Sequence, residues 1–247
     1  MKLIQINTIA SAFSTGRIAE QIGKLMQSRD WESYLAYGRF ANASSNRLIK
    51  IGNRFDQALH LLESRLFDRH GLSSKIATKR LIEKIKQIDP DVIHLHNIHG
   101  YYLNYPILFD YLSQAGKPVV WTLHDCWAFT GHCSHFATAN CYRWKSGCFA
   151  CPLKGIYPRS IGLDRSRENY ADKRYYFNKV KNLTIVTVSQ WLKQLVQQSM
   201  LRYDNLICIP NGIDLNCFRP IDHIDPKYDF AGKKVLLGVG TKWTREK

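Results

Sequence analysis

The residues best suited to chemistry follow a short apolar run near the middle of the chain. Val119–Leu123 form this run, and Gly116 and Pro118 precede it, as is typical of a buried parallel strand. His124 and Asp125 come directly after its last residue. Ligands of open α/β sheets bind outside the carboxyl ends of the strands. We therefore expect a functional site at this point.

His124 and Asp125 are of residue types that can move or orient a proton. Side chains that are adjacent on an extended chain point in opposite directions, so we do not expect these two to bond to each other as a dyad. A histidine and an aspartate that merely cap a loop are the simpler alternative. We expect each side chain to contact a bound molecule separately.

Four cysteines follow this site, and their spacing favours a metal. They stand at Cys133, Cys141, Cys148 and Cys151. The last two have the CxxC form that lets two thiolates share one tetrahedral Zn²⁺, and His132 and His135 are able to replace one cysteine. We predict a closed, structural zinc site with four cysteine ligands. Free buried thiols or a labile disulfide are the alternatives.

The overall charge points to an anionic partner. The chain has 35 basic and 20 acidic residues, a formal net charge of +15, which suits nucleic acid, a membrane surface or a phosphorylated ligand. It has neither a secretory signal nor a run of roughly 18 apolar residues that would span a membrane. We therefore expect a cytoplasmic protein, in which cysteines stay reduced and favour metal binding.

Strands and helices alternate along most of the chain. Apolar periodicity predicts strands over 3–6, 34–40, 92–96, 119–123, 184–188 and 206–209. It predicts helices over 18–26, 58–67, 75–88, 105–113, 164–180 and 190–199, with an exposed polar loop over 41–58. This alternation predicts an α/β fold with a Rossmann-like, doubly wound parallel sheet.

The alternation also suggests how the domains are divided. We predict one domain over 1–216 with a cysteine-rich insert at about 126–160, and a connector over 217–233. Residues 235–239 read as another buried strand, so 234–247 are expected to form the first strand and turn of a truncated second domain. A lone first strand cannot bury itself.

The turn between the first strand and helix is a second candidate site. Ser14 and Thr15 can cap the helix, Gly16 leaves backbone N–H groups accessible, and Arg17 adds positive charge. This combination suits a phosphate. A plain capped turn is the alternative.

Four stretches in this order resemble one enzyme family. They are His96–Asn104, His124–Pro152, Val188–Trp191 and Pro210–Asp214. The chain resembles the front part of bacterial retaining glycosyltransferases of family four, which have the GT-B fold and build exopolysaccharide, colanic acid or O-antigen. In that family two Rossmann-like domains face each other. The amino-terminal domain binds the acceptor, often an undecaprenyl-diphosphate-linked sugar, and the other binds a UDP- or GDP-linked sugar donor.

The resemblance also implies roles for single residues. It assigns donor binding to Gly16, Arg17, Asn211, Gly212 and Lys247. It assigns acceptor binding to His96, Asn97, His99, Tyr101, Asn104 and Trp127. His124 would position the transferred sugar, and Asp125 would contact the acceptor or support the loop. Thr241 departs from the family, because many members carry an arginine there that stabilises the leaving diphosphate.

The resemblance implies sugar transfer with retention in cell-surface polysaccharide biosynthesis, at the inner face of the plasma membrane. Because most of the donor domain would be missing, we expect little or no transfer by the 247 residues alone. Two alternatives remain at this stage. One is a basic, zinc-containing nucleic-acid-binding protein, and the other is a nonfunctional truncated remnant.

Overall fold

A computed structural model describes residues 1–220, 228, 230 and 232–238. The chain forms two units, residues 1–211 and 212–247. The strands of the first unit are β1 Lys2–Ala10, β2 Glu32–Ala41, β3 Arg47–Lys50, β4 Val92–Leu95, β5 Val119–Leu123, β6 Leu183–Thr187 and β7 Asn205–Cys208. Its helices are α1 Phe13–Gln27, α2 Arg54–Phe67, α3 Lys75–Ile88, α4 Tyr105–Gln114, α5 Ser166–Phe177 and α6 Gln190–Gln197.

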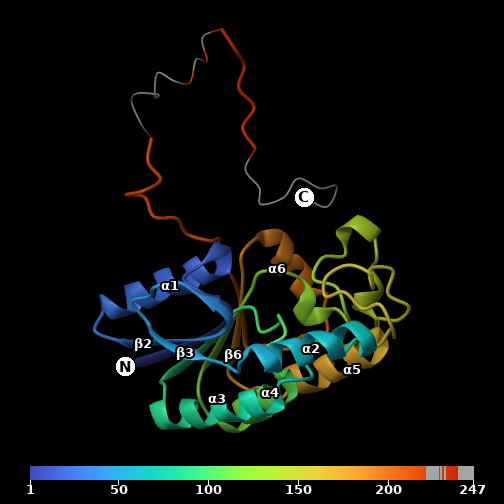
Figure 1. Ribbon diagram of the computed structural model, residues 1–247. Helices are drawn as coiled ribbons and strands as arrows, with labels where there is room; N and C mark the ends of the chain where they lie inside the picture. The colour runs from blue at the N-terminus through green and yellow to red at the C-terminus, as the bar shows by residue number, and fades with distance from the viewer. Residues whose placement is uncertain (221–227, 229, 231, 239–247) are drawn as a thin grey trace. The chain divides into compact units, whose positions relative to one another are not determined.

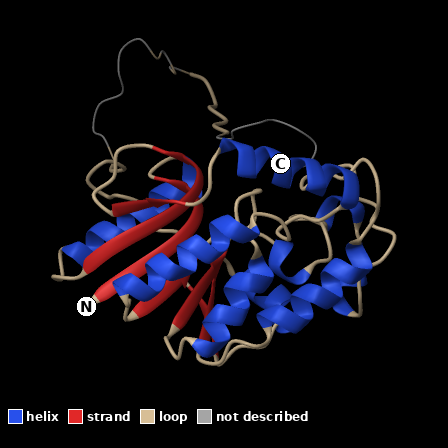
Figure 2. Cartoon of the chain, turned by 60° about the horizontal axis from the view of Figure 1, so that its bottom comes forward, coloured by secondary structure: helices blue, strands red, loops and turns tan. Residues whose placement is uncertain are grey.

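The seven strands make one parallel sheet in the order β3-β2-β1-β4-β5-β6-β7. The predicted doubly wound α/β fold is therefore confirmed. Helix α1 lies on one side of the sheet and α3 and α4 lie on the other (Figure 1). The twisted strands and their helical cover are drawn in Figure 2. The chain runs outward in both directions from β1 and β4, so the switch point where ligands bind in such folds lies between these two strands.

The central strands β1 and β4 are buried over most of their length, as a parallel sheet between two helical layers requires, with apolar residues on one face and the polar Gln5 and His94 on the other. Ile4 and Ile6 of β1 and Ile93 of β4 are fully buried. On one face, Trp121 packs its ring against Phe109 and Phe177, with centroids 5.4 and 5.0 Å apart. This aromatic packing fixes α4 and α5 beside the carboxyl end of β5.

One strand was missed by the sequence prediction. Residues 41–58 were expected to be a loop, but Arg47–Lys50 form the edge strand β3, which pairs with β2. Ile49 alone of its four residues is buried, so the period-2 signal is too weak to read. Helix α2 also begins earlier than predicted, because Asn53 and Asp56 form a capping box at its start.

The described residues of the second unit contain no helix or strand. The strand predicted over 235–239 is absent from 235–238, where Leu236 and Leu237 are 99% and 87% exposed, and Val239 lies outside the described residues. A strand without a neighbour cannot satisfy its backbone hydrogen bonds. The second domain stays a prediction. In the part of the chain that the structure describes, no helix is long and apolar enough to cross a bilayer.

Candidate active site

The polar tips of β4 and β5 meet because these strands are parallel neighbours, with His94 opposite Val120 in the register. His96 follows β4 and His124 follows β5. Their rings stack with centroids 5.6 Å apart, and His96 Nδ1 lies 3.3 Å from His124 Nε2 in a hydrogen bond. The structure thus brings these two residues together at the carboxyl ends of the neighbouring strands.

A buried hydrogen-bond chain assigns the protons of this pair. Gln5 Nε2 donates to the Ala19 carbonyl at 2.8 Å, which leaves Gln5 Oε1 to accept from His96 Nε2 at 3.1 Å. Burial lowers the pKa of His96 well below its usual value, so the ring is neutral and its Nδ1 accepts. His124 Nε2 must then donate. Burial also lowers the pKa of His124, to about 4, and its Nδ1 keeps a lone pair for another donor.

Asp125 pairs with a histidine from the neighbouring strand end instead of with His124. His99 Nε2 donates to Asp125 Oδ2 at 2.9 Å, and the Trp127 backbone N–H donates to Oδ1 at 2.9 Å. Burial raises the pKa of Asp125, but the nearby His99 and the two hydrogen bonds outweigh that effect, so the pKa is lowered overall. The Tyr157 hydroxyl lies 3.0 Å from His99 Nδ1. The expectation that His124 and Asp125 do not form a dyad is confirmed.

These groups differ in their access to solvent. His124 and Asp125 are half-buried, as is Asn97, whereas His96 is 1% exposed and His99 is 8% exposed. His96 and His99 therefore lie behind the accessible pair. Direct acceptor binding by His96 is not supported, because its two ring nitrogens are already engaged.

Three further residues predicted to bind the acceptor are buried in the structure. Asn104 is the N-cap of α4, and its amide donates to the Leu72 carbonyl. Tyr101 and Trp127 are 7% and 1% exposed and form part of the aromatic packing beneath His99. In the sequence these polar and aromatic residues were reasonable candidates for binding a ligand. In the structure all three side chains pack in the protein interior.

A buried lysine supports the loop that carries Asp125. Lys173 of α5 is 1% exposed, and its Nζ lies 3.6 Å from the ring centroid of Trp127. It donates to the carbonyls of Trp127 and Thr130 at 2.7 and 2.9 Å. Burial lowers its pKa to about 7. Lys173 thereby fixes the short 3₁₀ helix η1, Trp127–Phe129.

Sequence reasoning missed Gln5, Tyr157 and Lys173. A glutamine inside the apolar β1 run was a weak signal for a buried polar contact. Lys173 resembled any other lysine on a charged helix, and Tyr157 comes from a loop 58 residues away from His99. Only packing brings these side chains to the site.

The residues predicted to bind the donor are less closely grouped than the histidines and Asp125 described above. Helix α1 begins at Phe13 with Ala12 as its N-cap, so the predicted hydroxyl cap is wrong. Gly16 is a buried residue of the helix, where an added Cβ would lie 3.1 Å from the Ile9 carbonyl oxygen. Arg17 is exposed.

The other residues predicted to bind the donor come later in the chain. Asn211 follows β7, two strands away from β5, at the same edge of the sheet. Gly212 belongs to the second unit. Lys247 and Thr241 lie outside the described residues.

The four predicted zinc ligands converge. Cys133, Cys141, Cys148 and Cys151 all line one cavity of about 20 Å³, and all are free thiols. As the side chains stand, the described residues include no group of three or more His, Cys, Asp or Glu that could hold a metal ion.

Comparisons with known proteins agree with this architecture. The chain is 26% identical over 253 residues to WcaC of Escherichia coli (strain K12), a putative colanic acid biosynthesis glycosyl transferase. The match covers 97% of this chain and 61% of the relative. The solved sucrose-phosphate synthase of Thermosynechococcus elongatus has a similar fold, with a TM-score of 0.52 at 12% identity, covering 89% of this chain and 50% of that one. The chain thus spans between half and two thirds of these relatives. The sequence model of Glycosyltransferase Family 4 matches residues 15–216, so the chain belongs to that family.

Proposed function

We propose that this chain forms the acceptor-binding side of a retaining glycosyltransferase in cell-surface polysaccharide biosynthesis. The enzyme would move a sugar from a nucleotide donor to a saccharide acceptor. Family membership and the name of the E. coli relative support this reaction class. The observation that carries the proposal is the pairing of His124 with His96 and of Asp125 with His99 at one edge of the sheet. Neither the family nor the fold favours the nucleic-acid-binding alternative.

The two accessible side chains are suited to sugar hydroxyls. His124 offers its Nδ1 lone pair, because Nε2 is committed to His96. Asp125 is ionised and each of its oxygens has used one hydrogen bond, so the carboxylate can accept more. Hydroxyl groups donate to both kinds of acceptor. We assign His124 to the transferred sugar and Asp125 to the acceptor, with His96 and His99 as positioning residues.

The donor is proposed to be a UDP- or GDP-sugar whose diphosphate lies near the start of α1. The first turn of this helix contains no acidic residue, so its positive end is not neutralised, and Arg17 adds a charge. A nucleoside diphosphate leaves with growing negative charge, which such groups stabilise. Asn211, Gly212 and Lys247 complete the proposed donor contacts.

The test is transfer of radiolabelled sugar from a panel of UDP- and GDP-sugars to the butanol-extractable lipid of bacterial membranes. It is run with the 247-residue chain alone and with the chain joined to the part of the E. coli relative that it does not cover. We expect transfer by the joined protein and little or none by the chain alone. Absence of transfer by both proteins with every donor would contradict the proposal.

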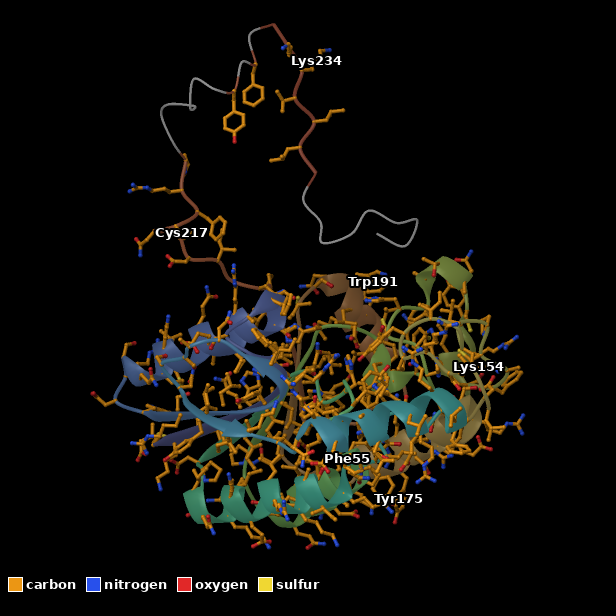
Figure 3. The ribbon with its side chains drawn as sticks, viewed as in Figure 1. Phe55, Lys154, Tyr175, Trp191, Cys217 and Lys234 are labelled. Carbon is orange, nitrogen blue, oxygen red and sulfur yellow. The ribbon has the colours of Figure 1, made fainter. Side chains whose placement is uncertain are left out.

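A lipid-linked acceptor would bring the protein to a membrane, and α2 offers a face for this contact. Phe55, Leu59, Leu62 and Leu66 recur at helical spacing and are 76%, 47%, 54% and 38% exposed. Phe55 is labelled on the first turn of α2 in Figure 3. Basic residues stand within and after this helix, at Arg54, Arg65, Arg69, Lys75 and Lys79. An exposed apolar stripe with basic neighbours suits an anionic lipid surface.

Vesicle binding tests this face directly. We expect the protein to bind vesicles containing phosphatidylglycerol and to bind pure phosphatidylcholine weakly. The double substitution Phe55→Ser and Leu62→Ser should weaken binding by about tenfold or more, because two apolar side chains leave the lipid. The control Leu25→Ser removes a 51% exposed leucine from α1 and should leave binding unchanged. Equal binding by both variants would exclude α2 as the contact.

A further inference from the structure

The cysteine-rich segment closes around a single small cavity. Cys133, Cys141 and the Cys148/Cys151 pair reach it from three separate stretches of loop. Its volume of about 20 Å³ is close to that needed by one water-sized occupant. Four free cysteines that line one small cavity are an unusual use of this residue type.

His132 provides an independent observation at the same cavity. It lines the cavity wall, and its side chain is fully buried in a 2.6 Å contact between Nδ1 and Asp68 Oδ1. Its other nitrogen, Nε2, is buried, and among the described residues it has no hydrogen bond of normal geometry. A polar atom that is buried without a good hydrogen bond destabilises the folded protein. A charged group in the cavity would give this atom something to bind.

The backbone around the cysteines is arranged to support thiolates. The Gly131 N–H donates to Cys148 Sγ at 3.1 Å, and such bonds stabilise a negative sulfur. The Cys151 N–H is held by Asp164 at 2.6 Å, which fixes the CxxC turn. A backbone N–H donor therefore faces one of the sulfur atoms.

The segment also lacks the regular structure that would hold it in shape. Between η1 and α5 the described chain forms only two single-turn 3₁₀ helices, Ala137–Ala139 and Arg143–Lys145. Loop-rich segments of this length are commonly fixed by a metal or by disulfides. The same segment carries Tyr157 to His99, so its shape matters to the candidate active site.

We propose that Cys133, Cys141, Cys148 and Cys151 bind one Zn²⁺ through four thiolates. Each thiol gives up its proton to solvent, and His132 Nε2–H donates to one of the resulting sulfur ligands. The thiol side chains must turn inward by rotation about χ1, since in the described structure no three of these groups stand at metal-holding spacing. A tetrahedral S₄ set selects zinc, and the closed site is structural. This proposal goes beyond the transferase function and does not depend on it.

Metal content tests the proposal without reference to activity. The full chain is purified without a histidine tag and under reducing conditions, and its zinc is measured by elemental mass spectrometry. We expect one zinc per chain. Replacement by Co²⁺ should give sulfur-to-cobalt charge-transfer absorption and the intense visible bands of a tetrahedral site.

Matched variants locate the site. Cys148→Ser with Cys151→Ser should abolish stoichiometric zinc, whereas Cys208→Ser, in β7 away from the cavity, should retain it. His132→Asn should retain zinc with about 10–100-fold weaker affinity, as removal of an outer partner does. If the double variant does not fold, the wild-type stoichiometry and cobalt spectrum decide alone.

Three results would overturn the zinc site. One is folded wild-type protein with far less than one zinc per chain. Another is zinc retained by the Cys148→Ser, Cys151→Ser protein. The third is a disulfide among the four cysteines in protein alkylated at cell lysis.

Discussion

Replacing Asp125 with asparagine should lower kcat/KM for sugar transfer by the joined protein by about 100-fold. The carboxylate accepts hydrogen bonds from His99 Nε2 and from the Trp127 N–H through different oxygens. Asparagine has one acceptor oxygen, so its NH₂ group would face one of these donors, and the negative charge would be lost. Loss of a charged hydrogen bond and one unsatisfied donor together cost about 3 kcal/mol, which corresponds to about two orders of magnitude in rate.

A matched substitution separates this effect from a general loss of charge. Asp110 of α4 has a 46% exposed side chain and an ion pair with Lys179. Asp110→Asn should change kcat/KM by less than about twofold, since exposed ion pairs contribute little. Near-ultraviolet circular dichroism checks that both variants keep their packing. Full activity in a folded Asp125→Asn protein would remove Asp125 from the site.

Acid should destabilise the first unit strongly between pH 7 and pH 5. Burial lowers the pKa values of five histidines: His60, His70, His94, His96 and His124. The pKa is about 3 for His60 and for His94, and about 4 for His124. In the unfolded chain these groups titrate near 6.5. As the pH falls below that value, the unfolded state binds protons that the folded state refuses.

The direction and size of this acid destabilisation follow from the linkage between proton binding and folding. The stabilising contribution of each neutral histidine is complete above pH 6.5 and is lost as the pH falls toward its folded pKa, at up to about 1.4 kcal/mol per pH unit. The three histidines with stated values should together lower the free energy of unfolding by about 5 kcal/mol at pH 5. Urea unfolding at several pH values measures this change and the number of protons taken up.

Two controls assign the acid effect to these histidines. His94 is buried in the sheet, where its Nε2 lies 2.8 Å from the Thr122 hydroxyl. Asparagine does not bind a proton in this pH range, so His94→Asn should reduce the number of protons taken up on unfolding by about one. His135 is exposed, and His135→Asn should leave the uptake unchanged. Excess zinc in parallel samples separates loss of metal from histidine protonation. A free energy of unfolding that is constant from pH 7 to pH 5 would contradict the prediction.

The main elements of the fold were predictable from local pattern. Val119–Leu123 was predicted with its observed bounds, and the other strands of the sheet except β3 were placed within a few residues. β1, β4, β5 and β6 are buried over most of their length, so their largely apolar sequences are recognisable as strands. Edge strand β3 was not predicted, because its pairing with β2 defines it more than its composition does. The resemblance to family four also needed only motifs and their order, and the family model confirms it.

The pairing within the candidate site was decided by tertiary structure. Sequence placed His96 at the end of one predicted strand with His99 after it, and His124 and Asp125 after the end of another. The parallel pairing of β4 with β5 brings His96 to His124 and His99 to Asp125. The sequence did not show that the side chains of Asn104 and Trp127 would be buried. A residue's type states what bond it can make, and burial and neighbours decide which bond it does make. For that reason the sequence determined the strands and the kinds of polar group at their ends, while only packing determined which of these groups remain accessible to a ligand.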